Sequence, residues 1–419
     1  MIYFSVNQPI TLVRNELRQS LGPESAAGQR AAYVTSAYDF MDLQRRGSRA
    51  GVQPFQLLDE EAILSTPGAP VELGVSNRKE AMRYLGRSRG EAMPMAVRPL
   101  ESCVPALKSR ESPRLAIING FGTGIGDYIV GLTAWRIARE RLLGAGCKDV
   151  SAEIWARTHA IPRASVACAG EPTLRALRAL PIGLDRFLEL DGFWDLSSML
   201  DRPAFRQMPT IDFLLLSLGV DPDSVEPKSK RNQVRIPAAV QSEVDAALSD
   251  LPQPFVLLHS TSSTPLRDMP DVILRPLIDE LDQRNQFAVA SLHSLPVPQD
   301  KYFDLSHLFR SHKHFCAVIR RAAGLLTVDT STYHVADAFG IPTLVVFTTV
   351  PSERWIPYYP TVQAITLEGI RESEHFGLHR SDDRETLTEI HELWNKLDLG
   401  QLTDRFMAMV AHGHAAGGA

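Results

Sequence analysis

The chain has 419 residues, 44% hydrophobic and 22% charged, which suits two or three domains of roughly 150 residues each and excludes a wholly disordered protein. Lysine and arginine total 44 against 49 acidic residues, and this net charge of −5 excludes a generally basic nucleic-acid-binding protein. The four cysteines form no CxxC pair, which excludes a disulfide scaffold or a cysteine-rich zinc module and favours a reducing compartment.

The first 114 residues lack the regular alternation of strands and helices that marks the rest of the chain. We expect a strand at residues 2–6 and a short helix at residues 78–85, separated by loops rich in Gly, Ser and Arg. Prolines at 94, 99, 105 and 113 indicate a linker. Residues 1–114 are therefore predicted to be a small accessory region of unknown role.

Residues 115–232 begin an alternating pattern. An apolar strand is expected at 115–119, followed by a helix in which apolar residues recur every three or four positions. Further strands are predicted at 150–156 and 186–190, and an apolar helix at 210–218. The polar stretch 221–232 is the predicted linker to the second half. We expect this part to form an N-terminal, acceptor-binding Rossmann-like domain.

Residues 233–400 repeat the pattern more clearly. The predicted strands are 255–259, 287–292, 325–329, 343–348 and 364–367, and the predicted helices are 271–284, 315–323, 332–339 and 384–397. This alternation predicts an α/β fold with parallel sheets covered by helices on both faces. Ligands of such sheets bind beyond the carboxyl ends of the strands. Residues 401–419 are expected to form a C-terminal helix and a flexible tail.

The glycine-rich turn after the first of these strands is the first candidate site. Glycines alternate from Gly120 to Gly126, but Ile125 breaks a G-x-G-x-x-G fingerprint and no lysine completes a Walker loop. The turn leads to Asp127 in the first turn of a helix, where the helix dipole favours an ionised carboxylate. Asp127 is either a general base or an ordinary helix cap, and the spacing alone leaves both open.

The segment Val328-Asp-Thr-Ser-Thr-Tyr-His-Val-Ala-Asp-Ala-Phe-Gly-Ile-Pro342 is the second candidate. A strand is expected to end at Asp329, and a helix to begin near Thr332. Free amides at the helix start, with the hydroxyls of Thr330, Ser331 and Thr332, form a suitable anion site. His334 is placed to donate to a phosphate and Asp329 to accept from sugar hydroxyls. The alternative is an ordinary N-cap beside a buried histidine.

Two more polar loops follow predicted strands. The loop after residue 347 carries Thr348, Thr349 and Arg354, and the loop after residue 259 carries several hydroxyls and Arg267. Because the carboxyl ends of parallel strands lie at one edge of a sheet, four such loops predict a cleft for a sugar joined to a diphosphate.

The G-x-G-D turn, the loop ending in Arg267 and the D-[ST]-x-x-x-H-x-A-x-A-x-G-x-P segment together resemble glycosyltransferase family 9, the lipopolysaccharide heptosyltransferase-like group. The resemblance covers about residues 115–397. It implies a GT-B fold of two facing Rossmann-like domains and metal-independent, inverting transfer from a nucleotide-sugar. It also implies that Asp127 is the base, on an acceptor-side loop with Gly124 and Gly126. Donor phosphate and sugar are then held by Arg267, Asp329 and His334.

Three features depart from the family pattern. Ser331 stands where glycine is usual, Thr348 replaces the glycine of an F-G-x-T turn, and about 114 residues precede the first family strand. The sugar, heptose or a hexose-like one, therefore stays open, as does the choice among glycan, lipid-linked and protein acceptors. Since no apolar run reaches the roughly 18 residues of a membrane span and no signal segment is seen, we expect a cytoplasmic protein, with peripheral contact at the inner membrane as a second option.

Other interpretations remain. The chain could be a nucleotide-sugar 2-epimerase, or a protein that binds nucleotide-sugar without turnover. A metal-dependent function would use side chains in the region 293–316, namely His293, His307, His312, His314 and Cys316. The favoured interpretation needs neither a cofactor nor a metal, and its partners are the donor and acceptor rather than a nucleic acid.

Overall fold

The computed structural model describes residues 99–180, 189–196, 205, 207–284, 286–379, 381 and 383–417. Before residue 99 it describes the segments 2–14, 17–21, 24, 33–35, 55–58, 71–72 and 93–94. The predicted helix at 78–85 and most of the predicted strand at 186–190 lie outside the described residues.

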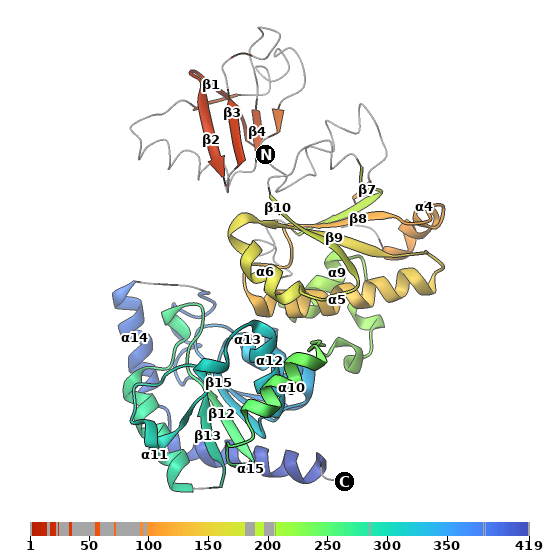
Figure 1. Ribbon diagram of the computed structural model, residues 1–419. Coiled ribbons are helices and arrows are strands. Elements are labelled where there is room, and N and C mark those ends of the chain that lie inside the picture. Colours follow the sequence, from red (N-terminus) through yellow and green to blue (C-terminus); the bar gives the residue numbers. More distant parts are fainter. Residues whose placement is uncertain are drawn as a thin grey trace. The chain divides into compact units, whose positions relative to one another are not determined.

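The described N-terminal segments are β-strands, drawn in red in Figure 1. Strand β1 (Ile2–Val6) confirms the predicted strand and pairs antiparallel with β4 (Tyr33–Thr35) and β5 (Phe55–Leu57). Strand β6 (Val71–Glu72) extends this sheet beside β4. Strands β2 (Ile10–Arg14) and β3 (Leu17–Leu21) form a separate hairpin.

A parallel sheet follows, with the strand order β10-β9-β8-β11-β7. Its strands are β7 (Met93–Pro94), β8 (Arg114–Ile118), β9 (Ser151–Arg157), β10 (Leu174–Leu180) and β11 (Gly192–Asp195). The strands expected at 115–119 and 150–156 are confirmed. The helices in this part of the chain are α4 (Val104–Lys108), α5 (Ile125–Gly144), α6 (Ile161–Cys168) and α9 (Thr210–Ser217).

The C-terminal half contains a second parallel sheet, of six strands in the order β14-β13-β12-β15-β16-β17. The strands are β12 (Phe255–His259), β13 (Ala288–Ser291), β14 (Phe303–Asp304), β15 (Gly324–Val328), β16 (Thr343–Phe347) and β17 (Val362–Thr366). The predicted α/β class with two parallel sheets is thus confirmed. Counted along the chain, the order is third, second, first, fourth, fifth, sixth, which is the doubly wound order of Rossmann folds.

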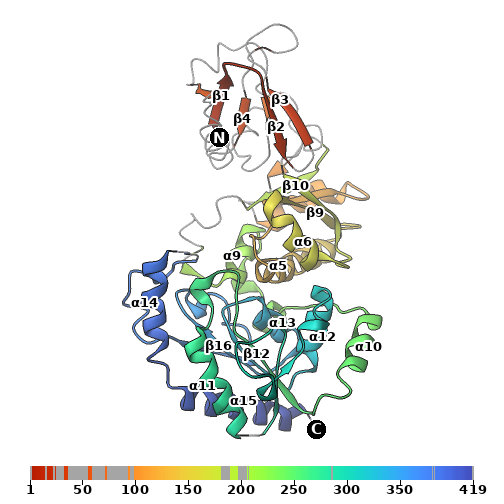
Figure 2. The same cartoon turned by 60° about the vertical axis from the view of Figure 1, so that its left-hand side comes forward.

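Helices cover both faces of this sheet (Figures 1 and 2). One face packs against α11 (Asp271–Arg284), α14 (Arg384–Trp394) and α15 (Leu399–Gly417). The other packs against α10 (Ala238–Ala247), α12 (His312–Arg321) and α13 (Ser331–Phe339). Because both faces are covered, the inner strands β12, β15 and β16 are almost wholly buried and appear in the sequence as continuous apolar runs.

Two compact units make up the chain. The first consists of residues 1–123, 138–199 and 216–220, and the second of residues 124–137, 200–215 and 221–419. The first part of α5, with Asp127, therefore belongs to the unit that contains the six-stranded sheet. The predicted boundaries at residues 114, 232 and 400 stay predictions, because each unit is assembled from several stretches of the chain.

The polar stretch 221–232 is anchored inside the second unit. It forms two short 3-10 turns, Pro222–Ser224 and Pro227–Lys230. Lys230 is buried, and its Nζ lies 2.7 Å from Asp212 Oδ1. The backbone N–H of Asn232 donates to Asp337 Oδ2 at 2.9 Å, and the Asn232 side chain accepts from Thr133 of α5. These bonds join α5, this stretch and α13.

Candidate functional site

The candidate site lies where the strand order of the six-stranded sheet reverses, between β12 and β15. Doubly wound sheets bind ligands outside the carboxyl ends of the strands at this point. The loop after β12 ends in a 3-10 turn, Pro265–Arg267, and β15 is followed by Asp329. Arg267 Nη1 lies 2.7 Å from Asp329 Oδ2. The structure thus brings together two residues that the sequence predicted to share one sheet edge.

Arg267 is a largely buried cation. Its Nη2 donates to Ser263 Oγ at 3.0 Å, and its buried Nε has no hydrogen-bond partner among the described residues. Burial by itself lowers the pKa of Arg267, but Asp329, Tyr333 and Asp127 outweigh this effect, so that the pKa lies above its ordinary value. The guanidinium therefore stays charged, with its buried Nε left without a partner inside the described part of the protein.

Asp329 uses both of its carboxylate oxygens within the protein. Oδ2 accepts from Arg267, and Oδ1 accepts from the hydroxyl of Tyr333 at 3.0 Å. Burial, followed by the nearby carboxylate, raises the pKa of Tyr333 well above its usual value, so the phenol remains a donor. Asp329 therefore orients Arg267. No sequence pattern singles out Tyr333, which stands four residues after Asp329, in the first turn of α13.

Helix α13 starts beside this pair. Its N-cap, Thr330, has an extended backbone and makes no side-chain cap hydrogen bond, so the first-turn amides are not capped by that hydroxyl. Ser331 opens the helix. Thr332 is buried, and its Oγ1 lies 2.8 Å from Thr327 Oγ1; its role in donor binding stays a prediction. The helix ends at Gly340, whose φ of 69° is the left-handed conformation that glycine adopts without strain.

The start of α5 packs directly on the start of α13. A Cβ atom placed on Gly126 would lie 2.6 Å from Cδ2 and 2.9 Å from Nε2 of His334, and 3.6 Å from Cα of Ser331. Only glycine fits this contact. The other ring nitrogen of His334, Nδ1, lies 2.7 Å from the hydroxyl of Tyr359. The two helix starts, each carrying a partial positive charge, therefore converge at this edge of the sheet.

Asp127 is the third residue of α5 and is partly exposed. Its Oδ2 accepts from the backbone N–H of Gly124 at 2.8 Å, which is the cap interaction predicted as one of its two roles. It lies near enough to Arg267 to contribute to the raised pKa of the guanidinium. Asp127, Arg267, Asp329 and the α13 start thus form one cluster, and the cap bond occupies one of the two carboxylate oxygens.

The other predicted donor-site residues have different environments. Thr349 is buried and donates to the carbonyl of Leu378 at 2.6 Å. Thr348 is also buried, and its Oγ1 has no hydrogen-bond partner among the described residues. The guanidinium of Arg354 is buried 4.2 Å above the ring centroid of Phe205. Their roles in donor binding stay predictions.

The histidines and cysteine of the metal-dependent interpretation do not form one cluster in the part of the chain that the structure describes. His293 Nε2 lies 2.9 Å from Ser260 Oγ, and His314 is bound to Ser311 and Glu243. Cys316 contacts His312 at 3.6 Å, and burial lowers the pKa of this histidine to about 4. These residues serve separate local contacts.

Acid should destabilise the protein through His334. Burial lowers the pKa of His334 to about 3, whereas an unfolded histidine titrates near pH 6.5. Below pH 6.5 the unfolded chain binds a proton at this histidine, whereas the folded chain binds it only below about pH 3. The free energy of unfolding should therefore fall by about 2 kcal/mol at this residue between pH 7.5 and pH 5.

Denaturant unfolding of the wild type and of His334→Gln at both pH values measures this loss, and the variant should lose about 2 kcal/mol less on acidification. Burial raises the pKa of Asp337 to about 6, which acts with the opposite sign, but this residue is present in both proteins and cancels. An equal loss of unfolding free energy on acidification in both proteins would contradict a neutral, buried His334.

No protein-family model and no curated protein sequence matches the chain. Solved structures similar to it include ADP-heptose lipopolysaccharide heptosyltransferase II of Escherichia coli, which is 12% identical over 68% of this chain and 99% of its own, with a TM-score of 0.44. A glycosyltransferase family 9 protein of Veillonella parvula is 11% identical over 73% and 99%, with a TM-score of 0.47. The iron-containing dodecameric glycosyltransferase TibC of enterotoxigenic E. coli is 13% identical over 72% and 77%, with a TM-score of 0.46.

Two of these proteins, the heptosyltransferase and the family 9 glycosyltransferase, carry the name of the family that the sequence motifs resemble. Among the residues described, none of the helices is both long and apolar enough to span a bilayer.

Proposed function

We propose that this protein is a glycosyltransferase that transfers a sugar from a nucleotide-sugar to an acceptor hydroxyl, with inversion and without a metal ion. The observation that carries the proposal is the cluster at the carboxyl edge of the six-stranded sheet. There, the carboxylate of Asp127 lies within electrostatic reach of the buried guanidinium of Arg267, beside the start of α13.

The donor side of the cluster suits a diphosphate. Negative charge grows on the diphosphate as its bond to the anomeric carbon breaks, and fixed positive groups at that position lower the barrier. The Arg267 guanidinium supplies a fixed positive charge, and the first-turn amides of α13 add donors at the positive end of a helix dipole. A cation supplied by the protein can thus do the work that a metal ion does elsewhere.

The acceptor side needs a base. Asp127 would take the proton of the acceptor hydroxyl while that oxygen bonds to the anomeric carbon and the electron pair of the broken bond leaves on the diphosphate. A single displacement of this kind inverts the anomeric centre. The N–H of Gly124 holds one carboxylate oxygen and orients the group. The acceptor, whether glycan, lipid-linked or protein, and any contact with a membrane surface are implied by the family resemblance alone.

Arg267→Gln should weaken binding of a nucleoside diphosphate about tenfold or more, because it replaces a charge-assisted contact by a neutral one. Calorimetric titrations with ADP and with UDP measure the change, and thermal unfolding reports whether Asp329 tolerates the loss of its cation. The exposed Arg275 of α11 supplies the control, Arg275→Gln. Equal affinity in wild type and Arg267→Gln would remove Arg267 from the donor site.

A thermal-shift panel of sugar nucleotides tests the activity itself, since a ligand that binds the native state raises the unfolding temperature. The nucleotide-sugar that gives the largest shift is then incubated with and without candidate acceptors. Acceptor-dependent release of nucleoside diphosphate supports transfer. A modified sugar nucleotide formed without acceptor would instead indicate an epimerase, and binding without any turnover a non-catalytic protein.

A further inference from the structure

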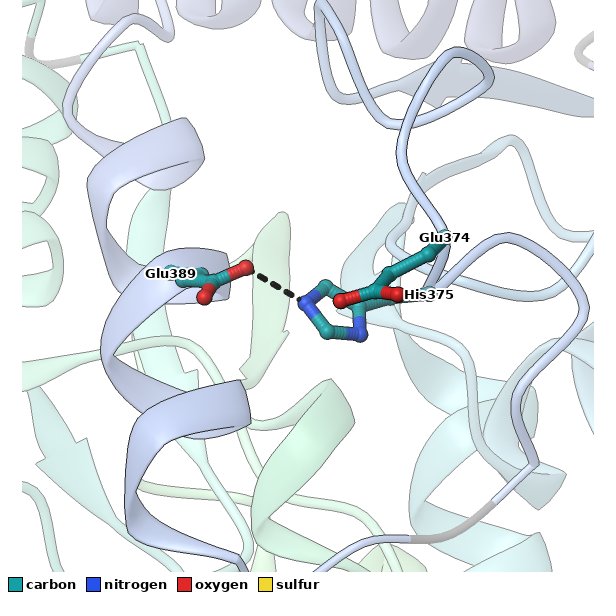
Figure 3. Close-up of side chains that lie close together, drawn as sticks. All are labelled: Glu374, His375 and Glu389. Carbon is teal, nitrogen blue, oxygen red and sulfur yellow. Dashed lines mark hydrogen bonds and ion pairs between the residues drawn. The ribbon is translucent and has the colours of Figure 1, made fainter.

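A second group of ionisable side chains contains neither Arg267 nor Asp329, and consists of Glu374, His375 and Glu389 (Figure 3). Glu374 and His375 belong to the loop after β17, and Glu389 belongs to α14. Nε2 of His375 lies 2.6 Å from Oε2 of Glu389, and one ligand atom from each of the three residues lies within 4.8 Å of the others. No motif in the sequence points to these three residues.

The three side chains differ in exposure: the histidine is buried and the two glutamates are exposed. His375 is 8% exposed, and its Nε2 lies 2.6 Å from Oε2 of Glu389, so burial and this bond hold the ring in place. Glu374 and Glu389 are exposed and free to adjust. A fixed imidazole with two adjustable carboxylates is a common arrangement around a divalent metal ion.

Within the described part of the chain, the two carboxylates also lack a lysine or arginine partner. Among the described residues, no lysine or arginine forms an ion pair with Glu374 or Glu389, and the nearby Arg371 is bound to Glu353 at 2.8 Å. Two like charges held close together on one imidazole favour the arrival of a positive ion.

We propose that Glu374, His375 and Glu389 bind one divalent transition-metal ion of the zinc class. Zinc binds His nitrogen and carboxylate oxygen at about 2.0–2.2 Å, which places neighbouring ligand atoms roughly 3.0–3.5 Å apart. To reach this geometry, His375 Nε2 and Glu389 Oε2 would have to move slightly apart. The exposed carboxylate of Glu374 would have to move slightly closer to them. The nitrogen ligand favours zinc over magnesium, which prefers oxygen ligands.

The position of the site indicates a structural ion. Metal binding would tie the loop that contains His375 to α14. The same loop is joined to the loop after β16, since Gly377 N–H donates to the Thr349 carbonyl at 2.7 Å and the Thr349 hydroxyl donates to the Leu378 carbonyl at 2.6 Å. The ion would therefore hold this loop in place, and the proposal does not depend on the proposed transfer reaction or its base.

The test is a calorimetric titration of the full, EDTA-treated protein with Zn²⁺, for the wild type and for Glu374→Gln/Glu389→Gln. The matched control, Glu385→Gln/Glu392→Gln, neutralises two exposed carboxylates of the same helix. We expect one zinc equivalent in the wild type and the control, weakened at least about tenfold in the first variant. Zinc should raise the unfolding temperature of the wild type and of the control, but not that of Glu374→Gln/Glu389→Gln.

Each other outcome overturns the proposal. Equal zinc binding in all three proteins would place the metal elsewhere, for example on other histidines of the chain. No zinc binding in the wild type would leave His375 and Glu389 as a plain hydrogen-bonded pair. If excess Mg²⁺ abolished the heat of zinc binding, the site would not be selective for an ion of the zinc class.

Discussion

Asp127→Asn should lower the rate of sugar transfer by about 10²–10⁴-fold, the usual loss when a general base is removed, and leave donor affinity nearly unchanged. The amide has the same shape as the carboxylate, and its oxygen can still accept the Gly124 N–H, so the start of α5 should keep its conformation. Only the capacity to take a proton is lost.

The measurement compares the initial rate of transfer and the affinity for the nucleoside diphosphate in wild type and variant. Asp271→Asn is the matched control, because Asp271 also lies in the first turn of a helix, α11, and is exposed. Turnover equal to that of the wild type in Asp127→Asn would show that Asp127 is a helix cap and nothing more.

Gly126→Ala should damage both stability and activity, because the new methyl group would lie 2.6 Å from the ring of His334. The ring cannot swing aside without breaking its 2.7 Å contact with Tyr359. Overpacking of this kind costs about 1–3 kcal/mol. Asp127 follows Gly126 directly, so a shift of about 1 Å between the two helix starts should also cost about 10²-fold in rate.

Two further variants isolate this contact. Gly144→Ala, at the other end of α5, has nothing within 4 Å of the new methyl group and should be neutral or slightly stabilising. In a His334→Ala background, which removes the ring, the cost of Gly126→Ala in free energy of unfolding should shrink markedly. The same cost in both backgrounds would refute a direct clash between Gly126 and His334.

The C-terminal sheet shows why much of the fold was predictable. Strands buried on both faces must be apolar along their whole length, so β12, β15 and β16 stand out as continuous runs. The short β14 and the strand β10 escaped prediction. The sequence of β10, LRALRAL, repeats every three residues as a helix would, and its pairing with β9 overrides that local preference.

Part of the candidate site could likewise be predicted from the sequence, and part could not. Residues next to strand ends were predictable, because parallel strands present their carboxyl ends at one edge, and Arg267 and Asp329 do meet there. Their particular partners were not. Tyr333 on Asp329 and Tyr359 on His334 depend on how α13 is rotated and how the loop after β16 returns to it. The pairing of Glu389 with His375, fourteen residues apart, depends equally on how α14 docks.

The sequence by itself determined the alternation of strands and helices in the two parallel sheets and the chemistry of the loops after the strands, because hydrophobic periodicity and turn residues act locally. Only the tertiary structure decided that the first part of α5 packs with the six-stranded sheet, with Gly126 pressed on His334 and Asp127 near Arg267. That choice depends on contacts between residues well over a hundred positions apart, and such contacts leave no local pattern in a single sequence.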